Sequence, residues 1–186
     1  GSRESVMGAL TEPALLLSII AVLLTTTETN IGNVIQNVLQ HDFFISNFSW
    51  WLALIAFVIV LIIETGRLPY DNPDTHLELT MMHESMMLEY SGRYLGLMVL
   101  FVQIKQLLLI TALINLFFPY GIAVNVGYLE VAQALVLYVS KVFIVGLGLA
   151  VIETVYAKIR LFLVPNLILA SISLAVLSLI FQLFNY

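Results

Sequence analysis

The fold is decided by residues 43–63, FFISNFSWWLALIAFVIVLII, a run of 21 residues without a charged side chain. A helix needs about 20 mostly apolar residues to cross the hydrocarbon core of a bilayer, so this run is long enough to span one. The rest of the chain is similar, because 61% of its 186 residues are hydrophobic and only 10% are charged. Soluble domains have roughly 45–50% apolar and about 25% charged residues. The sequence therefore predicts an integral membrane protein.

Four further apolar runs of similar length lie before and after this one. Together they predict an all-α integral membrane protein with about five transmembrane helices, in a single membrane domain over residues 1–186. The expected spans are residues 6–27, 43–63, 94–118, 128–156 and 165–184. Proline kinks a helix interior but is tolerated at a helix start. Pro13 therefore makes the first span either one kinked helix or a short helix that begins near residue 13.

The basic residues outside the spans predict how the chain is oriented. They all fall before the first span, between the second and third, or between the fourth and fifth: Arg3, Arg67, Arg93, Lys158 and Arg160. The other two connections, residues 28–42 and 119–127, contain no lysine or arginine. By the positive-inside rule, the segment 64–93 faces the cytoplasm and the C-terminus faces outward.

The segment 64–93 is acidic and is expected to carry an amphipathic helix on the cytoplasmic side. From Glu64 to Glu89 it holds six carboxylates, two histidines and one arginine. Asn72-Pro73 is a turn signal, and Thr75 with Glu78 forms a capping box, so the helix is predicted to start near residue 76. Such a segment is too polar to span a bilayer and too apolar for a free loop. We expect it to lie along the interface beneath another protein.

Charged residues inside the spans are the main candidates for function. Lys105 and Lys141 lie near the middles of the third and fourth spans, where a charge costs at least ~2.5–3.5 kcal/mol. Neither lysine has an acid three or four residues away, so partners must come from other helices or other chains. The glutamates at the span ends are open to two interpretations. They either form part of a polar path through the membrane, or they only reach water and cap the helices.

Several classes of protein are excluded or disfavoured by composition. The chain has no cysteine, so it supplies no thiolate for an iron–sulfur cluster and no disulfide. Its net charge of −5 gives no reason to expect nucleic-acid binding. His76 and His83 are seven residues apart, which favours hydrogen-bonded interface histidines over a metal site. No nucleophile–base pair or phosphate loop is visible, so the sequence shows no active site or cofactor site of its own.

Three blocks of the sequence resemble the signature of one family of membrane subunits. They are ETGRLPYDNPDTHLEL at residues 64–79 with EYSG at 89–92, ETVYAKIRLFLVPN at 153–166, and Arg3 with TEP at 11–13. The family is shared by energy-converting (group 4) membrane-bound nickel–iron hydrogenases and respiratory complex I. Complex I members carry E-x-N-R-x-P-F-D followed by closely spaced glutamates. The present Thr-Gly-Arg and Asn-Pro-Asp-Thr-His-Leu-Glu resemble the hydrogenase form.

The resemblance implies a role in coupling. In such complexes a cytoplasmic hydrogenase-like large subunit and an iron–sulfur small subunit carry the nickel–iron site and the clusters, and they dock on this membrane subunit. Antiporter-like membrane subunits beside it move protons or sodium ions. Family members usually have further spans before these five, so we expect the chain to match the last five helices of a longer member. The resemblance also implies that the chain lies in the cell membrane of a prokaryote. No cofactor is expected in this chain.

The residues suggest how such coupling works. Carboxylates that crowd a partly dry site repel one another, so some keep a proton near neutral pH and are able to relay it. We expect a proton path made of Glu12, Glu64, Asp71, Asp74, Glu78, Glu84, Glu89, Lys105, Glu130, Lys141 and Glu153. A second group is expected to dock the partner or clamp the acidic loop: Arg67, His76, His83, Arg93 and Arg160.

Other functions remain open from the sequence. The acidic loop is either part of a relay or only a docking surface. The chain is alternatively a complex I-type quinone-site subunit or a sulfur-reducing relative. A stand-alone ion transporter is a further alternative, and it predicts helices interrupted at mid-bilayer, for which only Pro13 is a candidate.

Overall fold

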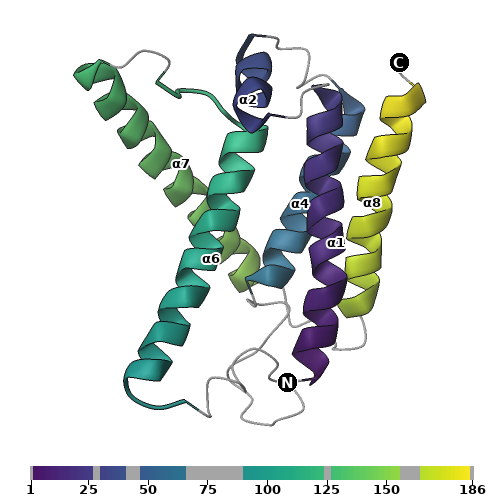
Figure 1. Ribbon diagram of the computed structural model, residues 1–186, viewed down its shortest axis with the longest axis vertical. Coiled ribbons are helices and arrows are strands. Elements are labelled where there is room, and N and C mark those ends of the chain that lie inside the picture. The colour runs from purple at the N-terminus through teal and green to yellow at the C-terminus, as the bar shows by residue number, and fades with distance from the viewer. Residues whose placement is uncertain are drawn as a thin grey trace.

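The computed structural model describes residues 2–26, 30–40, 47–65, 90–123, 127–155 and 164–184. All regular secondary structure within these ranges is helical (Figure 1). The helices are α1 (Ser2–Thr25), α2 (Ile31–Gln40), α4 (Phe48–Glu64), α6 (Arg93–Phe117), α7 (Tyr128–Val155) and α8 (Val164–Phe184). The predicted all-α class is confirmed, and five of these helices correspond to the five predicted spans.

Three of the helices are long and apolar enough to cross a bilayer: α6, α7 and residues 165–184 of α8. The apolar parts of α1 and α4 are shorter, Gly8–Leu24 and Phe48–Glu64. Helix α1 begins at Ser2 and continues through Pro13, so the alternative of a short helix starting near residue 13 is wrong. The predicted interfacial helix falls in residues 66–89, outside the described residues.

Helix α2 corrects the prediction that residues 28–42 are only a connection. Its apolar residues recur at the helical spacing i, i+3, i+4, i+7 and i+8: Ile31, Val34, Ile35, Val38 and Leu39. Val34 and Val38 are buried in the same core as Trp50 and Phe117. The signal for an amphipathic helix was therefore present, in a segment too short to span a bilayer.

Helices α1, α4 and α8 pack side by side and form the main body of the bundle (Figure 1). Small side chains allow this approach, since Ala14, Ala53, Ala56 and Ala175 are completely or almost completely buried. Helices that lack bulky residues at their contact come close enough for dispersion and hydrogen bonds between helices to hold them together. The start of α1 and the end of α8 lie at opposite ends of the bundle, as an odd number of spans requires (Figure 1).

Ser49 and Ser178 join α4 to α8 by reciprocal hydrogen bonds. Each hydroxyl donates to the other residue's backbone carbonyl, at 2.8 Å from Ser49 and 2.7 Å from Ser178. Both side chains are buried, Ser178 completely. Without water to satisfy them, these polar groups depend on each other.

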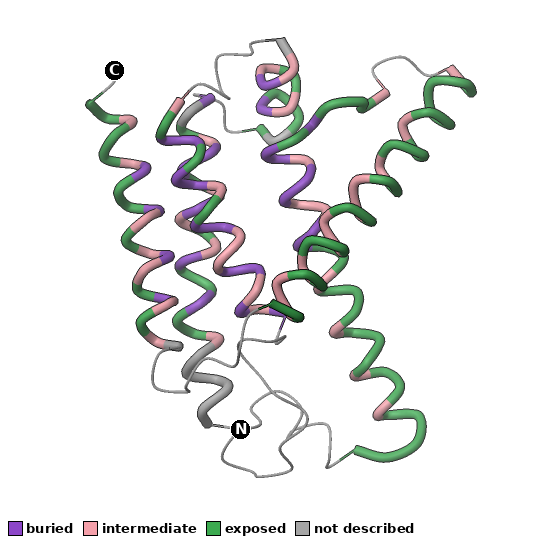
Figure 2. The backbone as a smooth tube through the Cα atoms, turned by 180° about the vertical axis from the view of Figure 1, so that it is seen from behind, coloured by how far each residue is buried: buried purple, intermediate pink, exposed green. Residues whose placement is uncertain are grey.

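Helix α6 leans away from this body, and α7 crosses α6 (Figure 2). An aromatic group connects α6 to the bundle, with the ring of Phe117 centred 5.4 Å from Trp50 and 5.7 Å from Phe57. No residue of α7 is buried, although the helix is strongly apolar. Such a helix needs a lipid or protein environment, which supports a membrane location.

Candidate functional site

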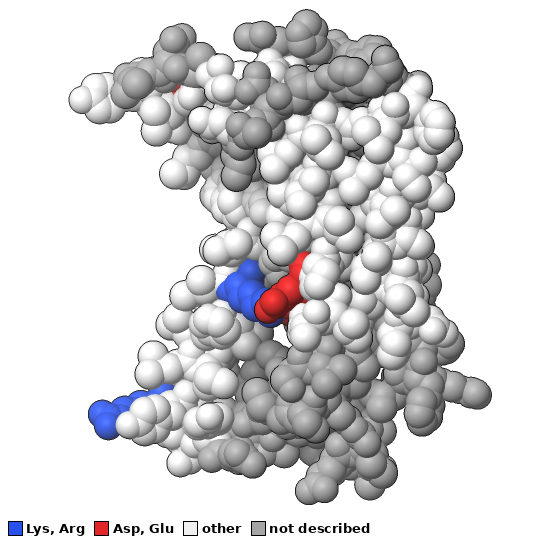
Figure 3. All heavy atoms as spheres, turned by 45° about the vertical axis from the view of Figure 1, so that its right-hand side comes forward, with Lys and Arg blue, Asp and Glu red and all other residues white. Residues whose placement is uncertain are grey.

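A buried carboxylate joins three helices at the end of α4. The Oε2 atom of Glu64 forms an ion pair with the Lys105 ammonium of α6, and its Oε1 atom accepts a hydrogen bond from the Thr11 hydroxyl of α1. The Glu64 side chain is 10% exposed, whereas that of Lys105 is 45% exposed. Figure 3 shows basic and acidic side chains meeting in a hollow of the surface. The carboxylate is thus held inside the bundle, and its cation is reached from outside.

The local structure around Glu64 explains why it needs a cation. Thr65 ends α4, with its N–H donating to the carbonyl of Leu61 at 3.0 Å. Glu64 therefore occupies the last turn, where the helix dipole presents its negative end and disfavours a further negative charge by about 0.3–1 kcal/mol. The Lys105 ammonium offsets both the charge of the Glu64 carboxylate and the negative end of the helix dipole. The partner of Lys105 comes from another helix. The sequence predicts this, because no acid lies three or four residues from Lys105.

The pair lies deep within the span of α6. Lys105 is 12 residues from each end of that helix, which places it about 18 Å from either end at the usual rise per residue. An unpaired charge at this depth would cost at least ~2.5–3.5 kcal/mol. The ion pair therefore places two compensating charges midway along the apolar helix α6.

Thr11 was not among the residues predicted from the sequence. It is only 2% exposed, and its hydroxyl lies 3.1 Å from the carbonyl of Gly8 as well as next to Glu64. One hydroxyl hydrogen serves one of these two acceptors at a time. Glu12, the residue predicted from this block, is exposed. The adjacent threonine, rather than the glutamate, is the α1 residue that reaches the site.

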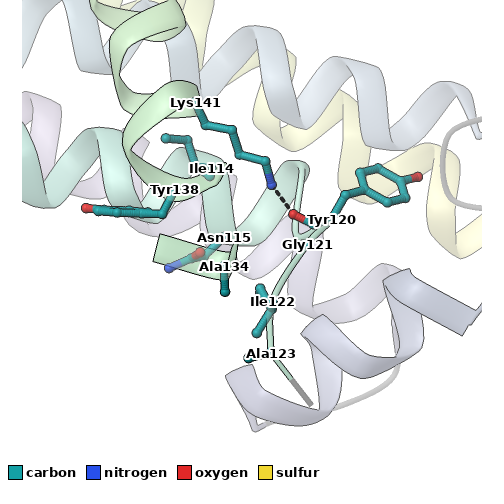
Figure 4. A pocket seen from close by; sticks show the side chains of 9 residues that line it. All are labelled: Ile114, Asn115, Tyr120, Gly121, Ile122, Ala123, Ala134, Tyr138 and Lys141. Carbon is teal, nitrogen blue, oxygen red and sulfur yellow. Dashed lines mark hydrogen bonds between the residues drawn. The ribbon is translucent and has the colours of Figure 1, made fainter. Parts of the chain in front are cut away.

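Within the part of the chain that the structure describes, the partners of Lys141 are backbone carbonyls rather than a carboxylate. Its ammonium donates to the carbonyl of Phe118 at 2.9 Å and to that of Tyr120 (Figure 4). These carbonyls follow the end of α6, where cations interact favourably with the helix dipole. Gly121 makes the turn possible, because its φ of +78° is in the left-handed region and a Cβ would lie 2.6 Å from Leu137 Cδ1.

A pair of hydroxyls joins α6 and α7 between the two lysines. Thr111 Oγ1 and Tyr138 Oη are 2.6 Å apart, and the Thr111 hydroxyl is also 2.7 Å from the carbonyl of Leu107. Neither residue was predicted from the sequence, because hydroxyls in an apolar helix give no distinctive pattern. They could have been predicted from their positions, because Thr111 lies within two turns of Lys105 and Tyr138 lies within one turn of Lys141.

Three other predicted candidates lie within the described residues. Glu130 is exposed in the first turn of α7, where a negative charge suits the helix dipole, and Glu153 is partly buried near the end of that helix. Arg93 is exposed at the start of α6, with its guanidinium 5.2 Å from the centre of the Tyr94 ring. The remaining candidates lie outside the described residues: Arg67, Asp71, Asp74, His76, Glu78, His83, Glu84, Glu89 and Arg160.

Comparisons with a family model and with known proteins agree on the family of this chain. The family model described as NADH dehydrogenase matches residues 1–183. The chain is similar to formate hydrogenlyase subunit 4 of Escherichia coli (strain K12), with 31% identity over 177 residues, 95% of this chain and 56% of that protein. It is also similar to hydrogenase-4 component C of the same strain, with 31% identity over 182 residues, 98% of this chain and 56% of that protein.

A third relative is an NADH-quinone oxidoreductase subunit of Rickettsia africae (strain ESF-5), with 28% identity over 158 residues, 76% of this chain and 43% of that protein. The chain spans about half the length of the curated relatives it matches. The family model nevertheless covers almost the entire chain. The chain belongs to the NADH dehydrogenase family, the membrane-subunit family shared by group 4 hydrogenases and complex I.

Proposed function

We propose that this chain is the membrane subunit of an energy-converting, hydrogenase-type complex, and that it couples electron transfer in a docked cytoplasmic module to proton or sodium movement. The module would carry the nickel–iron site and the iron–sulfur clusters in partner subunits. The names of the two Escherichia coli relatives support a hydrogenase-type complex. The observation that carries the proposal is the Glu64–Lys105 ion pair, which lies midway along the apolar helix α6, with Glu64 just before the acidic segment 66–89.

The pair is suited to respond to charge in its surroundings. Protonation of Glu64 would leave a neutral carboxylic acid beside an uncompensated Lys105 ammonium. A unit charge placed about 10 Å away changes the energy of such a group by roughly 1.7 kcal/mol in an effective dielectric of about 20, more than a tenfold change in proton affinity. Reduction of a cluster in a docked module would therefore shift the protonation of Glu64.

The acidic segment would form the entrance to this site, and Arg67 and Arg93 would clamp it by pairing with its carboxylates. The same segment would present the docking surface for the module. Lys105, Lys141, Glu130 and Glu153 would pass the charge change along α6 and α7 to antiporter-like neighbours. The contact between α6 and α7, including the Thr111–Tyr138 pair, supports this direction.

Neutralising the carboxylates in the assembled complex tests the proposal. Glu64→Gln and Glu89→Gln keep the side-chain shape but not the charge. Coupling predicts that ion transport is lost while assembly and uncoupled redox activity remain. Loss of assembly instead would show that the acidic segment only docks the module, and unchanged transport would contradict the proposal. Glu28→Gln, a carboxylate of the 28–42 connection outside the proposed set, serves as the control and is expected to behave like the wild type.

A further inference from the structure

A pocket of about 170 Å³ lies where α6 ends, the chain turns back and α7 crosses (Figure 4). Its walls include Asn115 of α6, Tyr120 and Gly121 of the turn, and Ala134, Tyr138 and Lys141 of α7. A water molecule takes about 30 Å³ in the liquid, so the pocket has room for several. Tyr120 and Gly121 are exposed, so the pocket borders the turn that follows α6.

The pocket has polar groups with hydrogen-bonding capacity left over. The Lys141 ammonium has three N–H donors, of which two serve the carbonyls of Phe118 and Tyr120. The Asn115 carboxamide lines the pocket and makes no hydrogen bond to the residues that the structure describes. Ordered water needs two to four polar partners, and the third ammonium proton, the Asn115 amide and the carbonyl oxygens supply them.

The groups that line the pocket set what it binds. Lys141, Tyr120 and Tyr138 are the titratable members, and none of the described lining residues is a carboxylate. Helix α6, which packs against this face of α7, contributes Asn115 and, one turn earlier, Thr111, neither of which titrates. Lysine is the one cationic side chain among the described residues that line the pocket.

The two carbonyls suit both protonation states of the lysine. A neutral amine has two N–H donors and a lone pair, and two donors match the two carbonyls of Phe118 and Tyr120. Loss of the third proton therefore leaves the side chain in place. The hydroxyl pair Thr111–Tyr138 lies next to the pocket, because Tyr138 also lines it. Thr111 is six residues, or about 9 Å, along α6 from Lys105.

We propose that this pocket is a water-filled proton-exchange site that opens on the side of the membrane carrying the 118–127 connection. The Lys141 ammonium gives one proton to a pocket water, which leaves as hydronium, and the amine keeps its lone pair. A proton arriving from the side of Lys105 past the Thr111–Tyr138 hydroxyls restores the ammonium. This inference rests on the proposed function, and it gives this chain its own route to the far side of the membrane.

Cysteine accessibility tests whether the pocket is wet and on which side it opens. The chain has no cysteine, so one introduced thiol is the only one it presents. In the assembled complex in oriented membrane vesicles, Ala134→Cys places a thiol in the pocket and Leu135→Cys places one on the exposed apolar face of the same turn. The probe is a membrane-impermeant, positively charged methanethiosulfonate. Thiolates are the reactive form and need water, so we expect Ala134→Cys to react at least about tenfold faster than Leu135→Cys.

The labelling should occur only with the reagent on the side of the 118–127 connection. Equal, slow labelling of both variants would show a dry pocket and overturn the inference. Labelling from the opposite side alone would overturn it as well. Because this readout does not depend on ion transport, its failure is distinct from failure of the proposed function, which the Glu64 and Glu89 variants test.

A second experiment separates proton exchange from simple capping of α6. Lys141→Arg keeps a cation with enough donors for both carbonyls, but a guanidinium does not release its proton. We expect this variant to assemble and to keep uncoupled redox activity while ion transport falls about tenfold or more, because the exchange step is blocked. Transport within twofold of the wild type would mean that Lys141 only caps the helix, and would overturn the inference.

Discussion

Glu64 and Lys105 form an ion pair that links the last turn of α4 to the middle of α6. Each residue alone would place a charge where the bilayer offers no solvation. Together they fix the position of α6 relative to the α1–α4–α8 body, and they form the site on which the proposed coupling depends.

Replacing Lys105 by methionine should destabilise the protein by about 2 kcal/mol, because Glu64 then keeps only the Thr11 hydroxyl as a partner among the residues that the structure describes. The value is below that of a fully buried pair because Lys105 is half-exposed. The expected fall in the thermal unfolding midpoint in detergent is roughly 4–8 °C. The double variant Glu64→Gln with Lys105→Met should recover at least half of this loss, since no charge is left unpaired. Additive losses would contradict a direct interaction.

Thr11→Val removes the hydroxyl that donates to Glu64 while keeping the side-chain shape. Hydrogen bonds to charged groups contribute about 1.5–3 kcal/mol, so we expect a loss near the lower value. Thr11→Ser, which keeps the hydroxyl, should lose much less, and Glu12→Gln, on an exposed position, should change stability by less than about 0.5 kcal/mol. The same thermal unfolding assay checks this. Equal effects of valine and serine would show that packing, not the hydrogen bond, matters at this position.

Gly121→Ala should disrupt the turn that presents the carbonyls to Lys141. A side chain at a φ of +78° costs about 1–2 kcal/mol, and the added Cβ would also press against Leu137. Gly96→Ala is the matched control. Gly96 lies within α6, and a Cβ added there would have open space around it, with nothing within 4 Å. That variant should be neutral or stabilising by up to about 1 kcal/mol. A Gly121→Ala protein as stable as Gly96→Ala would contradict the described turn.

Ser178→Leu should separate α4 from α8. The residue is completely buried against Ser49, and extra volume at such a contact costs about 1–3 kcal/mol. Ser178→Ala only removes hydrogen bonds, which between membrane helices average about 0.6 kcal/mol, so its loss should be much smaller. Unfolding in detergent with increasing denaturant distinguishes the two. A tolerated leucine would show that these helices do not approach as closely as described.

The helices could be predicted largely from the sequence because the length of an apolar run is set by the thickness of a bilayer. The ends of α6, α7 and α8 lie within a residue or so of the predicted spans. Helix α2 was missed because it is too short to span a bilayer, although its amphipathic pattern is regular. The interruption at Pro13 was ambiguous, since a proline's missing N–H permits either a break or continuation of the helix.

The site was only partly predictable. Lys105 and Glu64 stood out as charges in an apolar chain, but their pairing depends on how α4 and α6 pack, which no spacing in the sequence encodes. The partners of Lys141 are backbone carbonyls, which every residue has and which therefore leave no mark in the sequence. Thr11, Thr111 and Tyr138 were missed because a hydroxyl in a helix is usually satisfied by its own backbone.

The central claim is that the protonation of Glu64 follows the redox state of the docked module. Infrared difference spectroscopy of the assembled complex, reduced against oxidised, measures this directly through the carbonyl stretch of a protonated carboxylic acid. We predict a band that changes on reduction in the wild type and is absent from the Glu64→Gln complex. A band that persists unchanged in Glu64→Gln, or no carboxylic acid signal in the wild type, would contradict the claim.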